Sequence, residues 1–478
     1  MGTRLRRWLV LWCLVWVTAR VGTPQPDRVR LAQRLDAILG DGQLASASAG
    51  VLVVRTASGE VVYEREPDRA LMPASNMKIV TSLAALQYLG PAFRFTTTLC
   101  AEAAPNAQGW IVGDLYVRGS GDPTVTHEDL DTLAARLAAL GVTRITGEVV
   151  ADGSCFADPP LGRGWPASDE TYAYSAQICG LSVDGNVVHA EATGGPEAGA
   201  PCALQLSPPS SHLTLDPGCR TGGPDAGRPA LLRRRAQNVL YTTGPVPAGG
   251  RVSATVSMEA PDLYAAELLQ QCLVERGLRV DGACRRGVTP PSAVPMAWHR
   301  SPPLRDLLAM MNVPSDNNMA ESLLRALPLA RGEPGTGDEG TRILEEYLEE
   351  VGVPTSPLRL SDGSGLSRLN LLTPRALVGL LVHAARSADL REPFVASLPV
   401  AGVDGTLRSR MLGTAAAGRM RAKTGSLLGV CTLSGYVAGR DECELAVSLM
   451  MNNYTCAAAQ VRELQDRACA ALAEYTAP

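Results

Sequence analysis

Lysine is almost absent from this chain of 478 residues. Of its 44 basic residues only Lys78 and Lys423 are lysines, and all the others are arginines. The 48 acidic residues bring the formal net charge to −4, and the arginines are scattered along the chain. Nucleic-acid binding needs a clustered basic surface. The sequence therefore predicts no nucleic-acid partner.

Metal-ligand spacings are also missing. The five histidines lie far apart in the sequence, and no two cysteines form a CxxC motif. Zinc sites commonly use such closely spaced cysteine and histidine pairs. We therefore predict no metal site, and we expect no cofactor.

The apolar run near the N-terminus, "WLVLWCLVWV" at 8–17, is short for a membrane span. A spanning helix needs about 20 apolar residues. Here the run follows three arginines and leads to the small-residue exit "VTA", ending at Ala19. This pattern is typical of a secretory signal. We predict a signal over 1–22 and export to the periplasmic or another extracytoplasmic cell-wall space, with an uncleaved anchor or a peripheral membrane association left open.

Removal of that signal would leave eleven of the twelve cysteines. Cysteine-rich exported chains commonly form disulfides. We therefore expect disulfide bonds, with at least one thiol left over because the count is odd. Their connectivity does not follow from the sequence.

The periodicity of apolar residues predicts an α+β fold in two separated halves. The segment 49–68 has the pattern of two strands joined by a turn at Ser58 and Gly59, and 75–90 has the 3.6-residue spacing of a helix. Helical spacing returns after 301, and strands followed by a final helix are expected from 425 onward. Between the halves, short strand-like runs alternate with loops rich in proline and glycine.

We therefore predict a catalytic domain interrupted by a large β-rich insertion of two nested domains. The predicted boundaries are given by residue number: 23–94 for the first catalytic part, 95–290 for the insertion (95–165 with 240–290, and nested 166–239), and 291–478 for the second catalytic part.

The stretch "ASNMKIV" places Ser75 three residues before Lys78. On a helix this spacing puts both side chains on one face. An amine can remove the hydroxyl proton if burial or nearby positive charge lowers its pKa, whereas arginine stays charged and cannot act as the base. The simpler alternative is that Ser75 only caps the helix and Lys78 is a solvated surface charge.

Two further motifs carry the same kind of chemistry. Lys423, Thr424, Gly425 and Ser426 form "KTGS" on an expected strand, which would present a cation, a hydroxyl and a backbone N–H to a substrate. In "VPSDNNMAESLL", Ser315 and Asn317 stand at an expected helix start. Either motif alone also fits a turn or a helix cap.

Together, SxxK, SDN and KTG in this order are the set used by penicillin-binding proteins and class A β-lactamases. The chain resembles the low-molecular-mass class C penicillin-binding proteins, which are D-alanyl-D-alanine carboxypeptidases that also act as endopeptidases. Further similar stretches are "GSGDPTVT", "YSAQICGLSVDGN", "DGSGLSR" and "AGVDGTLRSRM", and Ser75 and Ser315 are 240 residues apart, which leaves room for that family's inserted domains. The "DGSGLSR" run either forms a structural turn or lines the cleft.

The resemblance implies a transpeptidase/β-lactamase-like domain, an antiparallel sheet flanked by helices. It also implies Ser75 as the acylated nucleophile, Lys78 as its base, and Ser315 and Asn317 as the proton relay and amide holder. Lys423 and Thr424 would receive the substrate carboxylate, with Gly425 allowing close approach and the N–H groups of Ser75 and Ser426 forming an oxyanion hole. The implied partners are peptidoglycan peptides ending in D-Ala-D-Ala and β-lactam antibiotics.

Two alternatives remain at this point. A serine β-lactamase would need a carboxylate that activates water, and none stands close after the SxxK segment. A catalytically silent wall-binding or β-lactam-sensing protein conflicts with the complete set of motifs.

Overall fold

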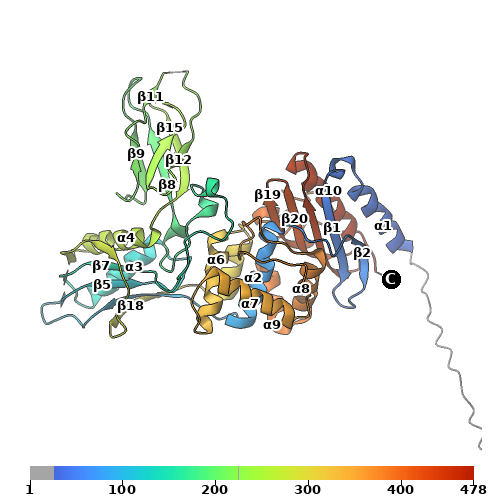
Figure 1. Cartoon of the computed structure of the whole chain (residues 1–478), viewed down its shortest axis with the longest axis horizontal. Helices are drawn as coiled ribbons and strands as arrows, with labels where there is room; N and C mark the ends of the chain where they lie inside the picture. The colour runs from blue at the N-terminus through green and yellow to red at the C-terminus, as the bar shows by residue number, and fades with distance from the viewer. Residues whose placement is uncertain (1–25, 224, 478) are drawn as a thin grey trace, which may run out of the picture.

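The chain folds into three connected parts, seen in the computed structural model of Figure 1. A body of helices and sheet contains both ends of the described chain, a second sheet with two helices extends from it, and a narrow β arm rises above the second sheet. The structure describes residues 26–223 and 225–477, so the predicted signal at 1–22 lies outside the described residues. Within these residues no helix is long and apolar enough to cross a bilayer.

The body is built on one antiparallel sheet made from the two ends of the described chain. Its strand order is β19-β20-β21-β1-β2. The strands are β1 (Ser48–Arg55), β2 (Val61–Arg65), β19 (Met420–Leu427), β20 (Val430–Ala438) and β21 (Glu444–Asn452). Gly59, with a φ of 80°, turns the chain between β1 and β2 as the sequence predicted.

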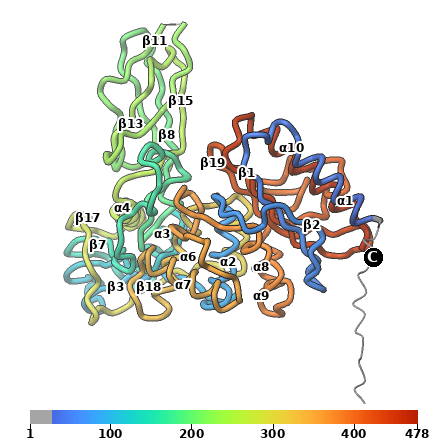
Figure 2. Tube along the Cα trace, turned by 45° about the vertical axis from the view of Figure 1, so that its right-hand side comes forward, coloured from blue at the N-terminus to red at the C-terminus, as the bar shows by residue number. Residues whose placement is uncertain are grey.

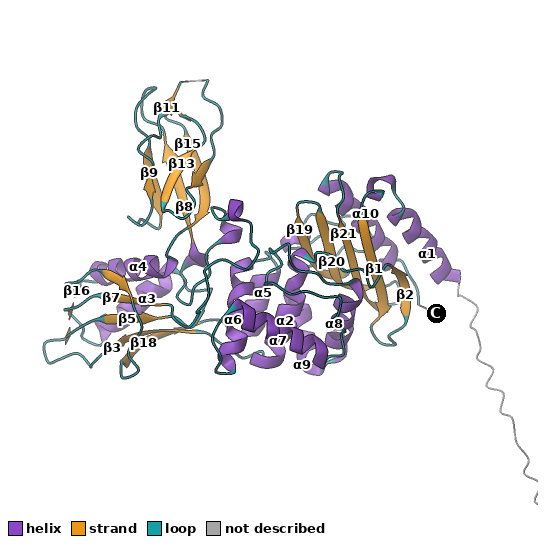
Figure 3. Ribbon diagram, viewed as in Figure 1, coloured by secondary structure: helices purple, strands orange, loops and turns teal. Residues whose placement is uncertain are grey.

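Helices cover both faces of this sheet (Figure 3). Neighbouring residues of β1 point to opposite faces, so Val51 packs with α1 (Pro26–Leu39) and α10 (Ala458–Ala473), whereas Leu52 packs with the other helices. The second layer contains α2 (Met77–Leu89), α5 (Leu304–Asn312), α6 (Asn317–Ala330), α7 (Gly337–Glu350), α8 (Pro374–Arg386) and α9 (Ala388–Ser397). This arrangement confirms the predicted α+β class.

Helix α2 lies inside the body, and every residue from Met77 to Leu86 is buried. A helix that is enclosed on all sides needs no polar face. Any polar side chain on it must therefore find its partners within the protein, and this applies to Lys78.

The inserted sheet mixes parallel and antiparallel pairs in the order β17-β7-β5-β3-β18. Its strands are β3 (Thr96–Ala101), β5 (Leu115–Arg118), β7 (Val149–Asp152), β17 (Cys284–Arg286) and β18 (Val294–Arg300). A small neighbouring sheet contains β4 (Trp110–Ile111), β6 (Arg144–Ile145) and β16 (Arg279–Val280). Helices α3 (His127–Ala139) and α4 (Pro261–Glu275) pack on it. The sequence reading described this part as β-rich and missed both helices, although Leu130, Leu133 and Leu137 have helical spacing.

The arm stands clear of the body (Figure 2). Its strands are β8 (Val187–Thr193), β9 (Ala203–Ser207), β10 (Thr214–Leu215), β11 (Thr221–Gly222), β12 (Leu231–Arg233), β13 (Val239–Thr242), β14 (Val246–Pro247) and β15 (Arg251–Ser257). β15 pairs with β8, so the sheets of the arm extend past residue 239. Similarly β18 pairs with β3, so the inserted sheet extends past residue 290. Because these paired strands are far apart in the sequence, the local sequence does not mark where the arm and the inserted sheet end.

The expected disulfides are absent from the part of the chain that the structure describes. All eleven cysteines there have free thiols, and five of them are buried. Several buried cysteines pack as small apolar side chains in different hydrophobic clusters, for example Cys272 in the insertion and Cys469 in α10.

Candidate active site

Ser75 lies in a single 3₁₀ turn, η2 (Ala74–Asn76), directly before α2. Asn76 occupies the N-cap position of α2, and no side chain forms a capping hydrogen bond there. The simpler alternative from the sequence, that Ser75 serves only as a cap, is therefore wrong. Its half-buried hydroxyl is available to other partners.

Lys78 is fully buried, which excludes the alternative of a solvated surface charge. Its Nζ donates hydrogen bonds to Asn317 Oδ1 at 2.6 Å and to the Ser364 carbonyl at 2.7 Å, and it lies 3.2 Å from Ser75 Oγ. Burial lowers the pKa of Lys78 to about 8, against the opposing effect of nearby carboxylates. Near neutral pH, the unprotonated amine is therefore more populated than in an ordinary exposed lysine.

The three partners of Lys78 differ in what they can do. The amide oxygen of Asn317 and the carbonyl of Ser364 can only accept hydrogen bonds, so they take the two N–H groups of a neutral amine. The remaining lone pair then points toward the hydroxyl of Ser75, which can donate a proton. This geometry suits proton transfer from Ser75 to Lys78.

The SDN motif lies where α5 leads into α6. Ser315 has a φ of 71°, in the left-handed region, and its side chain lines the cleft beside Ser75. Asp316 is the N-cap of α6, accepting from the Met319 N–H at 2.8 Å. The capping role that the sequence reading offered for this motif thus belongs to Asp316, which leaves Ser315 and Asn317 facing the cleft.

The KTG motif lies on β19, at the edge of the central sheet. Lys423 is fully buried and does not line the cleft, and its Nζ lies 3.0 Å from the Thr424 carbonyl. Burial and the neighbouring Lys78 hold the pKa of Lys423 well below its usual value. The Thr424 hydroxyl is 2.7 Å from that of Thr406, a residue that sequence reasoning did not assign. Thr406 belongs to the stretch "AGVDGTLRSRM".

Gly425 allows β19 to approach the serine turn closely. A Cβ at this position would lie 2.9 Å from the Ser75 backbone N and 2.8 Å from the Pro73 carbonyl. Ser426 follows and lines the cleft. The backbone N of Ser75 thus lies close to β19, and Ser75 and Ser426 line the same cleft.

The "DGSGLSR" loop (362–368) both forms a tight turn and lines the cleft. Asp362 accepts from the Gly365 N–H at 2.8 Å and the Ser367 N–H at 2.8 Å. Gly365 has a φ of 82°, and a Cβ there would lie 1.8 Å from the Ala74 carbonyl. Since Leu366 and Arg368 also face the cleft, the two interpretations left open by the sequence both apply.

The cleft has a volume of about 580 Å³. It is lined by Ser75, Pro166, Ser168, Asp169, Tyr174, Ser315, Asn317, Gly365, Leu366, Arg368, Ser426, Leu427 and Leu428. One wall therefore comes from the insertion, which sequence reasoning did not place at the site. Tyr174 anchors that wall, because its carbonyl accepts from Asn317 Nδ2 at 2.8 Å and its ring stacks on Tyr172 with centroids 5.4 Å apart.

The structure thus brings the three sequence motifs together around one cleft. Among the described residues no group of three or more histidine, cysteine or acidic side chains is arranged to hold a metal ion. An antiparallel sheet flanked by helices, with a serine and a buried lysine beneath a KTG edge strand, defines the class of penicillin-recognising serine enzymes.

Comparisons with known proteins identify the family within that class. The model of the D-Ala-D-Ala carboxypeptidase 3 (S13) family matches residues 31–475, so the chain belongs to this family. A D-alanyl-D-alanine carboxypeptidase of Actinomadura sp. (strain R39) is 40% identical over 461 residues, which cover 93% of this chain and 85% of the relative.

Solved structures agree with this assignment. The crystal structure of penicillin binding protein 4 from Haemophilus influenzae matches with a TM-score of 0.81 and 25% identity, covering 91% of this chain and 97% of that one. A second structure of that protein, in complex with a β-lactam, matches with a TM-score of 0.75 and 25% identity, covering 93% and 98%.

Proposed function

We propose that this chain is a serine-type D-Ala-D-Ala carboxypeptidase that acts on peptidoglycan stem peptides through an acyl-enzyme at Ser75. The observation that carries the proposal is the contact between Ser75 Oγ and Lys78 Nζ at 3.2 Å, made by a fully buried amine. The named activity of the Actinomadura relative and the family match support the substrate class.

Acylation begins when Lys78 accepts the Ser75 proton and Oγ attacks the carbonyl carbon of the penultimate D-alanine. The negative charge that develops on the carbonyl oxygen is stabilised by the N–H groups of Ser75 and Ser426. The C–N bond then breaks, and the leaving amine takes the proton from Lys78 through the Ser315 hydroxyl. Free D-alanine leaves, and the rest of the peptide stays on Ser75 as an ester.

Substrate capture depends on the cations and amides that surround the serine. Lys423 and the Thr424 hydroxyl receive the C-terminal carboxylate, and the side chain of Asn317 holds the peptide amide. Lys423 has unused N–H donors, because its only protein acceptor in the described structure is the Thr424 carbonyl. A carboxylate arriving there accepts from these N–H groups, and its negative charge raises the lowered pKa of Lys423.

The cycle ends when water hydrolyses the ester and returns Ser75 to its free form. If the leaving amine belongs to a neighbouring stem peptide rather than to free D-alanine, the same steps open a cross-link. The endopeptidase activity is therefore part of the proposal. A β-lactam presents a strained amide to the same hydroxyl, and we expect it to acylate Ser75 and to leave slowly.

The proposed place of action is the extracytoplasmic cell-wall space, where such peptides occur. The support is the sequence pattern of a secretory signal at 1–22 and the cell-wall substrate itself. Peripheral association with a membrane stays a prediction.

Purified protein incubated with pentapeptide and with isolated peptidoglycan tests this function. We expect mass spectrometry to find release of D-alanine and of opened cross-links, and labelled penicillin to map to the peptide that contains Ser75. Rapid hydrolysis of the penicillin would instead indicate a serine β-lactamase. No product and no label would indicate a catalytically silent protein.

A further inference from the structure

The Ser364 carbonyl, which accepts from Lys78, belongs to a peptide unit whose carbonyl and N–H are both hydrogen-bonded. Ser364 O accepts from Lys78 Nζ at 2.7 Å, and the N–H of the same peptide unit, that of Gly365, donates to Asp362 Oδ1 at 2.8 Å. The two preceding N–H groups, of Gly363 and Ser364, both donate to Glu321 Oε1 at 2.9 Å. Two carboxylates therefore set the orientation of the acceptor that Lys78 uses.

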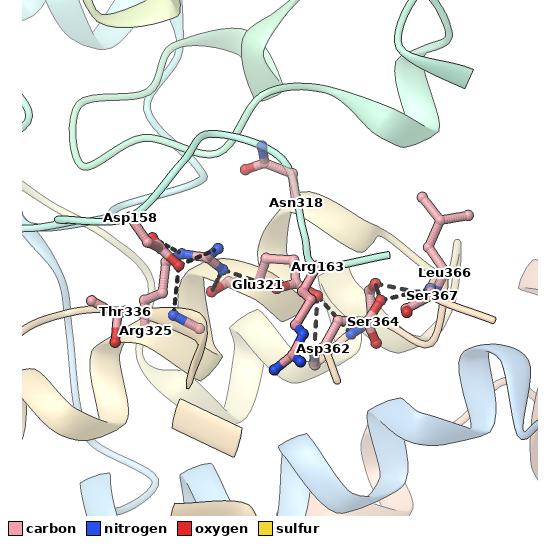
Figure 4. A network of polar contacts seen from close by, with 12 residues as sticks. Asp158, Arg163, Asn318, Glu321, Arg325, Thr336, Asp362, Ser364, Leu366 and Ser367 are labelled. Atoms are coloured by element: carbon pink, nitrogen blue, oxygen red, sulfur yellow. Dashed lines mark hydrogen bonds and ion pairs between the residues drawn. The ribbon is translucent and has the colours of Figure 1, made fainter. Parts of the chain in front are cut away.

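Glu321 is itself held by a chain of ion pairs that leads to the insertion (Figure 4). Its other carboxylate oxygen accepts from Arg325 Nη1 at 2.9 Å, one helical turn along α6. Arg325 then reaches Asp158 with two parallel hydrogen bonds of 2.9 and 3.0 Å. Asp158 lies in the inserted segment, where it also accepts from the Gly337 N–H at 2.7 Å.

A second contact from the insertion ends on the same loop. Trp165 Nε1 donates to Asp362 Oδ2 at 2.9 Å. Both carboxylates that orient the Ser364 peptide are thus connected to the inserted segment, Glu321 through Arg325 and Asp362 directly.

None of the three charged residues Asp158, Arg325 and Glu321 lines the cleft. The side chains of Glu321 and Arg325 are 1% and 2% exposed, so bringing their charges out of water carries a large desolvation cost. Buried ion pairs of this kind are often no better for stability than well-packed apolar side chains. They form a chain of contacts that ends on the loop holding Lys78, which suggests a role other than stability.

We propose that Asp158, Arg325 and Glu321 form a positioning relay through which the insertion holds the hydrogen-bond acceptor of Lys78 in place for acylation. The relay rests on the proposed role of Lys78 as the base of Ser75. It makes the insertion part of the machinery of the site, because the insertion supplies the outer end of the relay as well as one wall of the cleft.

The relay also bears on the charge state of Lys78. The charged groups that face its amine are Asp362, Asp316 and Glu321, which raise the pKa of Lys78, and the neighbouring Lys423. Neutralising Glu321 removes one of the three negative charges. The amine then remains unprotonated to a lower pH, so the acid side of the acylation profile moves to lower pH.

Asp158→Asn tests the link from the insertion, and the chain offers a matched control. Asp466 likewise pairs with the Nε and Nη2 of an arginine, Arg410, at 2.8 and 2.6 Å, although both of these contacts reach Oδ1, and the carboxylates of Asp158 and Asp466 are 20% and 22% exposed. Arg410 forms no hydrogen bond with the loop 362–368 in the described structure. We expect both variants to lose similar thermal stability.

The acylation rate with fluorescent penicillin should separate the two variants. We expect the limiting rate of Asp158→Asn to fall about tenfold with an unchanged half-saturating concentration, and that of Asp466→Asn to stay within about twofold of the original. Equal rates in the two variants would overturn the link to the insertion.

Glu321→Gln tests the end of the relay nearest to Lys78 through the pH profile of acylation. We expect the midpoint of the acid limb of this profile to fall by about half a pH unit or more. A folded Glu321→Gln protein with an unmoved midpoint would reduce Glu321 to a structural residue and overturn the relay. If that variant does not fold, the comparison of Asp158→Asn with Asp466→Asn decides. Failure of the unsubstituted protein to take up penicillin would count against the proposed function, whereas normal uptake by it and by the Asp158→Asn variant would count against the relay alone.

Discussion

The surroundings of Lys78 and Lys423 differ, although both side chains are fully buried. The amine of Lys78 meets three hydrogen-bond partners from three separate segments, and three carboxylates lie close enough to raise its pKa. The amine of Lys423 meets one backbone carbonyl, and the charged group that acts on its pKa besides burial is Lys78. The hydrogen bonds of the Lys78 amine are therefore complete, whereas the Lys423 amine has N–H donors without an acceptor among the described residues.

The difference separates two tasks that a buried amine can perform. A base must hold its lone pair toward one proton, which requires that its N–H groups be occupied elsewhere. A carboxylate receptor must keep N–H groups free for the incoming anion. The following predictions test this contrast, beginning with the largest expected effect.

Replacement of Lys78, the proposed base, should have the largest effect. We expect Lys78→Arg to lower the acylation rate by a thousandfold or more, because a guanidinium remains protonated and cannot accept the Ser75 proton. Penicillin labelling measures the rate, and circular dichroism checks that the variant is folded. A folded variant that still takes up penicillin at the original rate would show that Lys78 is not the base.

Gly425→Ala tests the closeness of the two regions. The new Cβ would come within 2.2 Å of Thr432 Oγ1 and within 2.9 Å of the Ser75 backbone N, so the contact between β19 and the serine turn must change. We expect acylation to fall about a hundredfold, in the range seen when an oxyanion-hole donor is lost. Gly244→Ala is the control, since nothing lies within 4 Å of a Cβ there. Equal activity of the two variants would contradict the close approach.

The pH dependence should follow the protonation of Lys78. Its pKa of about 8 means that the neutral, active amine is lost as the pH falls below that value. We expect the acylation rate to fall about tenfold for each pH unit on the acid side and to level off above the pKa. Stopped-flow measurement with fluorescent penicillin gives the profile. A rate that stays constant from pH 6 to pH 9 would sink this assignment.

Lys423→Arg should be milder than Lys78→Arg, because a guanidinium still binds a carboxylate. We expect the KM for a D-Ala-D-Ala peptide to rise about tenfold while part of kcat remains, since the larger head group must fit a fully buried site. Steady-state release of D-alanine measures both constants. If Lys423→Arg and Lys78→Arg were equally inactive, the division of tasks between the lysines would be wrong.

Thr406→Val should have the smallest effect. It removes the hydroxyl that lies 2.7 Å from the Thr424 hydroxyl while keeping the shape of the side chain. One neutral hydrogen bond contributes about 1 kcal/mol, so we expect a KM increase of a few-fold. Thr406→Ser restores the hydroxyl and should restore the KM. A defect shared by both variants would point to packing instead.

Part of the site could be predicted because three motifs carry it locally. The spacing of Ser75 and Lys78 brings their side chains together when the segment is helical, and the motif set identified the class and the family that the comparisons confirm. The assigned roles of the motif residues stay predictions, although the structure places Ser75, Ser315, Asn317 and Ser426 around one cleft and Lys78 in contact with Ser75.

Other parts had no local signal. The wall of the cleft from the insertion depends on Tyr174 meeting Asn317 across 143 residues of chain, and the hydrogen bond from Lys78 to the Ser364 carbonyl spans 286. Helices α3 and α4 were not predicted because short strand-like runs and loops rich in proline and glycine surround them in the sequence of the insertion. In addition, the expected disulfides do not occur among the described residues, where buried cysteines pack in separate clusters.

The sequence by itself determined the chemistry available to this protein. It contains Ser75, the two lysines Lys78 and Lys423, and the motifs that identify the family. Only the tertiary structure decided how that chemistry is tuned. Burial in α2 lowers the pKa of Lys78, and the acceptors around its amine come from segments far apart in the chain. The physical reason is that desolvation and hydrogen bonding depend on what surrounds a group in space, which sequence spacing does not specify.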